Sequence, residues 1–180
     1  IRTFEGKKRD CVRANGQVNC SWVDGSWETR GQYIGSYNVG TNPSRTAVNA
    51  ETGDVWIANR DSGDITKLDI NGTLLKTCAI GGGPRGLAIE QNGDVWVANS
   101  LDGNAKKISG DDESCAILQT VNLGGYPYGL AIDGDNNVWV ANRGKGVIQK
   151  INTATNTLDP KSYAAPGIYG ITVDKSNNVW

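Results

Sequence analysis

Residues 31–180 repeat one pattern: a short apolar run, a turn rich in Gly, Asn and Asp, and a second apolar run that contains a tryptophan. The second run reads GDVWIANR, GDVWVANS, NNVWVANR and a final NNVW, with steps of 40, 43 and 41 residues between the tryptophans. Short apolar runs separated by turn residues predict antiparallel strands. A lysine-containing third run and a looser fourth run follow each complete copy, so one copy predicts four strands.

Four short strands in a repeat of about 40–45 residues are typical of one β-propeller blade. We therefore expect an all-β fold, a β-propeller of four-stranded antiparallel blades, present as an incomplete segment of about three and a half blades. The blades are expected at about 44–80, 85–123 and 127–164, after a strand at about 31–39 and before the start of a fourth blade. Because propellers close with about four to eight blades, we expect a segment truncated at its C-terminus, with the ring closed by remaining blades of the same chain or by a neighbouring subunit.

The second strand of each blade carries apolar residues on both faces, which indicates a sheet covered on both sides. The repeated tryptophans are therefore expected to pack between blades and not to stack on a ligand. An asparagine closes this strand in every complete copy and is expected to cap the turn, although the asparagines could instead line a polar channel mouth. These structural repeat residues are Trp56, Trp96, Trp139, Trp180, Asn59, Asn99 and Asn142.

The GLAID-type first strand, the GDVWVAN-type second strand and the I-x-K-I third strand resemble those of the NHL and virginiamycin B lyase-like β-propellers, over residues 31–180. The resemblance implies the fold, but such propellers include enzymes, scaffolds and binding modules. Lyases of this group use histidine as a base or metal ligand, and the sequence contains none, so no catalytic residue carries over. Lactonase-type propellers hold a divalent cation with Glu, Asn and Asp, but Glu90 belongs to the other end of its blade.

The four cysteines indicate the cellular compartment in which the protein folds. The Asn-Gly pair at 15–16 is a strong hairpin signal, and pairing outward from it places Cys11 opposite Cys20 at a non-hydrogen-bonded position, within disulfide range. A bond between Cys78 and Cys115 would join adjacent blades, although their repeat positions differ. Disulfides favour a secreted, periplasmic or cell-surface protein. A metal site is not expected, because histidine and a close CxxC pair are both absent from the sequence.

Residues 1–30 lie outside the repeat and are expected to form a disulfide hairpin or cap segment, which either docks a partner or covers the first blade. The whole chain has 18 basic and 19 acidic residues, a balance that argues against a nucleic-acid partner. No apolar run approaches the roughly 18–20 residues of a membrane span. The segment from Asp133 to Asn137 is similar to a calcium loop but lacks its glycine and glutamate, so a β-turn is expected there.

Candidate chemistry gathers at one end of the blades, where the first strand begins and the second strand ends. Loops at that end line one face around the channel mouth, and arginine and tyrosine are frequent in them. Arginine offers a planar donor fork to anions, and tyrosine offers a stacking surface. Alternatively, the arginines pair with Asp61, Asp64 or Asp102 and only solvate the rim. The predicted ligand-binding residues are Arg45, Arg60, Arg85, Tyr126, Tyr128, Arg143 and Tyr169.

The sequence therefore predicts an extracytoplasmic β-propeller that acts as a binding or assembly module for a protein or a polar or anionic ligand. One alternative is a propeller enzyme of the lyase or lactonase type with catalytic residues beyond Trp180. Another is a structural subunit of a cell-surface assembly. Enzymatic activity is left open, with the absence of histidine against it. No cofactor is predicted, and a divalent cation belongs only to the lactonase-type alternative.

Overall fold

The computed structural model describes residues 7–14, 17–24, 35–110 and 114–180. The chain divides into two compact units, residues 1–36 and 37–180. In the first unit, β1 (Lys7–Ala14) and β2 (Gln17–Asp24) form an antiparallel hairpin whose register places Cys11 opposite Cys20. This is the predicted backbone pairing. The Cys11–Cys20 bond itself depends on side chains outside the described part and stays a prediction.

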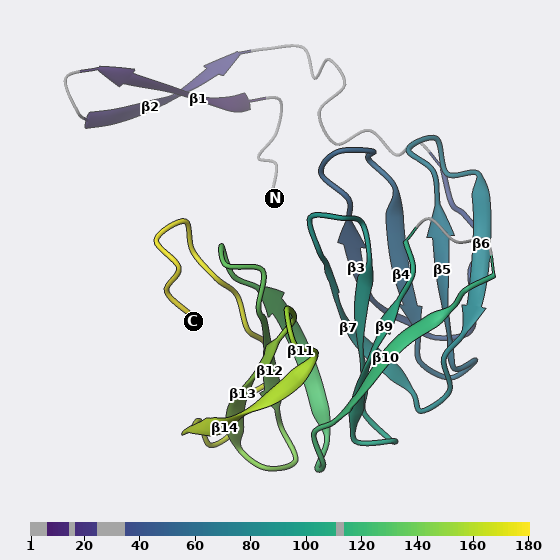
Figure 1. Cartoon of the computed structure of the whole chain (residues 1–180). Helices are drawn as coiled ribbons and strands as arrows, with labels where there is room; N and C mark the ends of the chain where they lie inside the picture. Colours follow the sequence, from purple (N-terminus) through teal and green to yellow (C-terminus); the bar gives the residue numbers. More distant parts are fainter. Residues whose placement is uncertain (1–6, 15–16, 25–34, 111–113) are drawn as a thin grey trace. The chain divides into compact units, whose positions relative to one another are not determined.

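The second unit contains three four-stranded antiparallel sheets, each with its strands in chain order (Figure 1). The prediction of an all-β, incomplete propeller is confirmed. No helix long and apolar enough to cross a membrane occurs among the described residues. Blade 1 comprises β3 (Pro43–Val48), β4 (Val55–Asn59), β5 (Asp64–Leu68) and β6 (Leu74–Ala79); blade 2 comprises β7 (Pro84–Ile89), β8 (Val95–Asn99), β9 (Asn104–Ile108) and β10 (Ile117–Asn122); blade 3 comprises β11 (Pro127–Ile132), β12 (Val138–Asn142), β13 (Val147–Asn152) and β14 (Thr157–Ala164).

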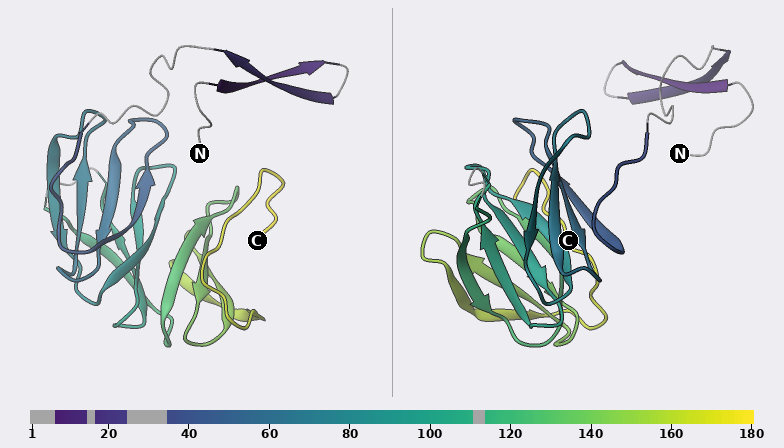
Figure 2. Two further views of the ribbon diagram at one scale, coloured as in Figure 1. Left: turned by 180° about the vertical axis from the view of Figure 1, so that it is seen from behind. Right: turned by 90° about the vertical axis from the view of Figure 1, so that its right-hand side faces the viewer.

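The first strands of successive blades, β3, β7 and β11, are neighbours in space, and the sheets follow one another in chain order (Figure 2). Gly86 in β7 allows the close approach to β11. A Cβ atom at this position would lie 2.5 Å from the carbonyl oxygen of Tyr128 and 2.8 Å from the amide nitrogen of Leu130. Glycine in a strand commonly marks such a close backbone approach. This close approach brings the first strands of blades 2 and 3 together next to Arg85 and Tyr128.

A hairpin after blade 3 begins a fourth blade. Val173 bridges Val179, and the backbones of Thr172 and Trp180 exchange two hydrogen bonds. The strand predicted at about 31–39 is wrong for residues 35–39, the part that the structure describes, because these residues form no strand. A strand requires a hydrogen-bonded neighbour, and blade 1 completes its four strands without this segment. Residues 31–34 lie outside the described part.

The hydrophobic core lies between the blades. Buried Trp56 packs with residues of blade 2, and buried Trp96 packs with residues of blade 3. Trp139 in blade 3 is half-buried, with its ring centroid 5.9 Å from that of Tyr163, and Trp180 is 72% exposed. The repeated position therefore makes a deep inter-blade contact wherever a complete blade follows it.

A carboxylate six residues before the tryptophan accepts a hydrogen bond from its indole N–H in three of the four copies, a feature that the sequence analysis missed. Asp133 illustrates the geometry: one carboxylate oxygen accepts the Trp139 Nε1–H at 2.8 Å, and the other accepts the backbone N–H of Asn137 at 2.8 Å. The backbone N–H of Asn136 donates to the Asp133 carbonyl at 2.9 Å, which confirms the predicted β-turn. The three pairs are Glu90–Trp96, Asp133–Trp139 and Asp174–Trp180.

Acid should weaken the contribution of Asp133 to stability. Burial alone would raise the pKa of this carboxyl, but hydrogen bonds from Trp139 and Asn137 outweigh burial and lower the pKa. A lowered folded-state pKa gives stability above the unfolded value of about 4, and that stability is lost as the pH falls through the folded value. Asp133→Asn should therefore destabilise the protein at neutral pH, and the difference should narrow at about pH 3. Urea unfolding at both pH values checks this; an equal difference at both would contradict it.

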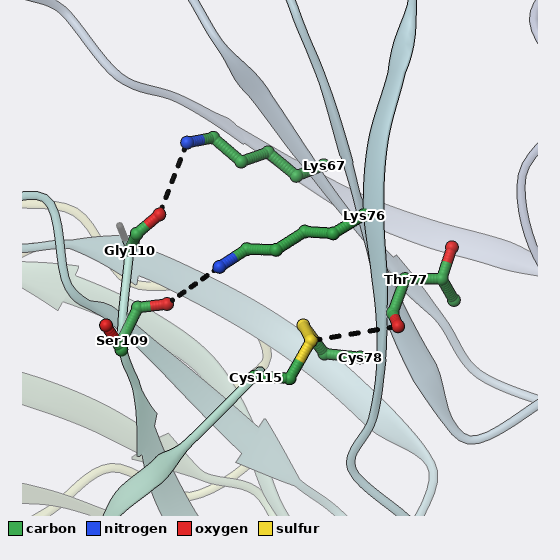
Figure 3. Close-up of a disulfide and its surroundings, with 7 residues drawn as sticks. All are labelled: Lys67, Lys76, Thr77, Cys78, Ser109, Gly110 and Cys115. Atoms are coloured by element: carbon green, nitrogen blue, oxygen red, sulfur yellow. Dashed lines mark hydrogen bonds between the residues drawn. A yellow bond between two sulfur atoms is a disulfide. The ribbon is translucent and has the colours of Figure 1, made fainter. Parts of the chain in front are cut away.

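A disulfide links the outer parts of blades 1 and 2. Cys78 in β6 is bonded to Cys115, which precedes β10, with 5.4 Å between their Cα atoms (Figure 3). Two lysines of blade 1 reach the same region of blade 2: Lys67 donates to the Gly110 carbonyl at 3.3 Å, and Lys76 donates to the Ser109 carbonyl at 3.1 Å. The covalent bond and the lysines together hold the outer strands of the two blades against each other.

Candidate functional site: an arginine–tyrosine cluster at the blade ends

The four residues that stand eleven positions before the tryptophans come together at one end of the blades. Arg85 and Tyr128 are the second residues of β7 and β11, and Arg45 is the third residue of β3. Tyr169 occupies the equivalent place ahead of the fourth-blade hairpin. A repeat places equivalent positions at equivalent points of neighbouring blades, so their side chains can meet across the blade boundaries.

Hydrogen bonds connect the tyrosines to Arg85. Its guanidinium donates from Nη1 to the Tyr128 hydroxyl at 3.1 Å and from Nη2 to the Tyr126 hydroxyl at 3.4 Å. The hydroxyls of Tyr128 and Tyr169 are hydrogen-bonded to each other, and their ring centroids lie 4.2 Å apart. One arginine and three tyrosines from blades 2, 3 and the fourth-blade hairpin thus form one connected group.

Three guanidinium groups lie over the tyrosine rings, within the roughly 6 Å range of cation–π contacts. The Cζ atom of Arg45 is 5.3 Å from the Tyr128 ring centroid and 5.2 Å from that of Tyr169. Arg85 lies 4.9 Å from the Tyr128 centroid, and Arg143 lies 5.7 Å from the Tyr169 centroid. We refer to these five residues, together with Tyr126, as the arginine–tyrosine cluster.

Arg60 behaves differently from the other arginines. Its Nε atom forms a salt bridge with Asp61 at 2.8 Å, and this contact raises the pKa of Arg60 and lowers that of Asp61. The alternative of rim arginines paired with aspartates therefore describes Arg60. No salt bridge to the three arginines of the cluster occurs within residues 35–110 and 114–180. The three arginines of the cluster therefore have no salt-bridge partner in the described part, although Asp61 is close enough to Arg85 for Arg85 to lower the pKa of Asp61.

The two hydrogen-bonded tyrosines shift in opposite directions. Burial raises the pKa of Tyr128, and its hydrogen bond to Tyr169 raises it further. The hydrogen bond with Tyr128 lowers the pKa of Tyr169, and the charges of the surrounding arginines add to that effect. Either hydroxyl can be the donor in this bond, and the Tyr128 hydroxyl also accepts from Arg85. The positive charges of Arg45, Arg85 and Arg143 near Tyr169 are among the causes that lower its pKa.

A cavity of about 410 Å³ adjoins the cluster. Two of its lining residues, Gly83 and Leu101, were not predicted from the sequence, and Asp61 was considered only as an ion-pair partner. The sequence feature that could have indicated this cavity is Leu101, an apolar residue in a turn where the other blades have Asp61 and Gly144. The lining residues are Arg60, Asp61, Gly83, Arg85, Leu101 and Tyr126.

Of the three repeated asparagines, all buried, Asn142 holds a loop of the site, whereas Asn59 and Asn99 bond to side chains of the next strand. Asn142 accepts the backbone N–H of Tyr126 at 3.1 Å and donates to the Gly124 carbonyl at 2.8 Å, which fixes the loop between blades 2 and 3. Asn59 donates to the side chains of Asp64 and Thr66 at 2.6 and 2.9 Å. Asn99 donates to Asn104 at 3.5 Å. No group of three or more His, Cys, Asp or Glu residues that could hold a metal ion occurs in the described part.

No protein-family model matches the sequence, and no curated protein matches it. Solved structures do match. Hydrazine synthase from Kuenenia stuttgartiensis gives a TM-score of 0.69 at 18% identity, covering 81% of this chain and 44% of that chain. A virginiamycin B lyase from Staphylococcus aureus, catalytically inactive and with Quinupristin, gives 0.68 at 18% identity, covering 97% and 55%.

The chain has the fold of the virginiamycin B lyase propellers. A nidogen/laminin complex also matches, with a TM-score of 0.61 at 14% identity over 74% of this chain and 52% of that chain. The chain spans about half the length of the chains it matches. At these identities the likeness concerns the fold alone, because one propeller fold serves many unrelated functions.

Proposed function

We propose that the propeller unit is a binding module that recognises anionic groups through the arginine–tyrosine cluster. The observation that carries this proposal is the set of three guanidinium groups, Arg45, Arg85 and Arg143, gathered on two tyrosine rings. These positive charges repel one another, and the attraction of each guanidinium to a bound anion offsets that repulsion. Guanidinium groups bind carboxylate, sulfate and phosphate with two parallel hydrogen bonds.

Not every N–H donor of the Arg85 guanidinium is used within the protein. Two of its N–H groups bond to tyrosine hydroxyls, and its Nε–H is buried without a partner in the described part. A buried donor without an acceptor is costly, so an oxyanion that gained access to Nε and accepted its hydrogen would remove that cost. This unpaired donor supports an oxyanion as the ligand.

We further propose an oxidising, extracytoplasmic compartment for the protein, supported by the Cys78–Cys115 disulfide between blades. The occupant of the site is then an anionic group on an extracellular or periplasmic molecule, either a small ligand or an acidic side chain of a protein.

Replacing Arg85 by glutamine should weaken the binding of inorganic phosphate about 10–100-fold, because a hydrogen bond to a charged group contributes about 1.5–3 kcal/mol. Titration at low ionic strength, followed by nuclear magnetic resonance shifts, measures the affinity. Lys161→Gln is the matched control: it also removes one positive charge, but exposed Lys161 in β14 lies outside the cluster and the cavity lining, so the affinity should change less than about twofold. No phosphate binding by the wild type, or unchanged binding by Arg85→Gln, would refute the proposal.

A further inference from the structure

The cavity beside the arginine–tyrosine cluster has a charged side and a hydrocarbon side. Arg85 supplies one positive charge, whereas the charges of Arg60 and Asp61 cancel in their salt bridge. Leu101 lies on the lining with 73% of its surface exposed, and Tyr126 adds an aromatic ring. An exposed leucine is ordinary by itself. An exposed leucine that shares a cavity with a guanidinium offers a ligand two different contacts.

The backbone fixes where Leu101 lies. Its N–H donates to the Gly82 carbonyl at 2.8 Å. A Cβ atom at Gly83 would lie 3.1 Å from Leu101 Cδ1, so the leucine side chain covers the backbone of Gly83. Gly83 also has a φ of 62°, in the left-handed region that glycine favours. The leucine is therefore held against the cavity wall by the loop that enters blade 2.

The turn does not itself require leucine. The same position holds Asp61 in blade 1 and Gly144 in blade 3, and both blades make the turn after their second strand. The cavity volume of about 410 Å³ falls in the range of about 300–1,000 Å³ found for small-molecule sites. Such sites are mostly apolar, with a few polar groups that orient the ligand. Leu101 and Arg85 supply these two kinds of contact.

We infer that this cavity binds an oxyanion that carries an apolar group, such as an aromatic ring or a branched chain. Arg85 binds the oxyanion, and Leu101 and Tyr126 contact the apolar group. Leu101 is thus a specificity-determining residue that selects apolar anions over simple ones. The inference rests on the proposed function, because it requires Arg85 to bind the anion.

Inorganic phosphate and phenyl phosphate separate the two contacts, because they share the oxyanion and differ by the ring. The full chain should bind phenyl phosphate about tenfold more tightly than phosphate, a ratio typical of one apolar contact. Leu101→Ser should remove most of this ratio and leave the affinity for phosphate unchanged. Arg85→Gln should weaken the binding of both probes. The matched control is Leu118→Ser, since Leu118 in β10 is 50% exposed and does not line the cavity; its ratio should equal that of the wild type.

The outcomes distinguish the two proposals. If phosphate binds through Arg85 but phenyl phosphate binds no more tightly, the inference fails and the proposed function stands. If Leu101→Ser weakens both probes equally, the leucine supports the loop and does not select the ligand, and the inference also fails. If neither probe binds the wild type, the proposed function fails and the inference fails with it. Thermal melting of each variant verifies that it is folded.

Discussion

Replacing Trp96 by alanine should lower the free energy of unfolding of the propeller unit by about 3–5 kcal/mol, the usual cost of removing a large buried aromatic side chain. Trp96 has no exposed surface, and it packs between blades 2 and 3 against residues such as Val138 and Val140. Its indole N–H also donates to Glu90, a carboxylate that is itself buried. The alanine variant therefore leaves both a cavity and a carboxylate with one donor fewer.

Trp180→Ala is the matched control, because Trp180 occupies the same repeat position but is 72% exposed. Its loss should be below about 1 kcal/mol, as for most surface substitutions. Urea unfolding followed by circular dichroism suits both variants, since this signal does not depend on tryptophan fluorescence. Equal losses at the two positions would show that burial between blades is not what the repeated tryptophan contributes.

The double variant Cys78→Ala/Cys115→Ala should lose about 4 kcal/mol of stability. The bond joins positions 37 residues apart, and chain-entropy arguments assign about 3 kcal/mol to a 15-residue loop and about 4.7 kcal/mol to a 100-residue loop. The variant keeps the contacts of Lys67 and Lys76 with blade 2. We therefore expect the blades to remain associated in the native state and to separate at a lower urea concentration.

Reduction of the wild-type protein provides an independent control. Dithiothreitol should lower the stability of the wild type toward that of the double variant and should lower the stability of the double variant much less. Thiol titration of the unreduced wild type should find Cys78 and Cys115 unreactive. A reactive thiol at either residue, or a double variant as stable as the wild type, would contradict the structural role of this bond.

The strands of the blades could be predicted because their signals are local. Short apolar runs around Trp56 and Trp96, together with the turn residues between runs, specify paired strands without reference to the rest of the chain. The strand expected at about 31–39 failed for the opposite reason. Its sequence is compatible with a strand, but strand formation depends on a neighbour that lies far away in the sequence, and the structure pairs residues 35–39 with none.

The meeting of arginines and tyrosines at one end could be predicted from the repeat, whereas the contacts among them could not. Equivalent positions of the sequence repeat must lie at the same end of each blade, and the length of the repeat is enough to show this. The hydrogen bond between Tyr128 and Tyr169 depends on side-chain rotamers and on the spacing of neighbouring blades. The same limit applies to Leu101, whose place beside Arg85 arises from the approach of two loops.

The position eleven residues before each tryptophan is largely separate from the positions that form the core between the blades. Arg45, Arg85, Tyr128 and Tyr169 occupy it, and none of them belongs to the hydrophobic core clusters. Substitutions of Arg45, Arg85 or Tyr169, which are half-buried or exposed, therefore alter what one blade presents without repacking the interior, whereas Tyr128 is buried. Under the proposed function, duplication of such a unit followed by single substitutions would change the ligand preference one blade at a time.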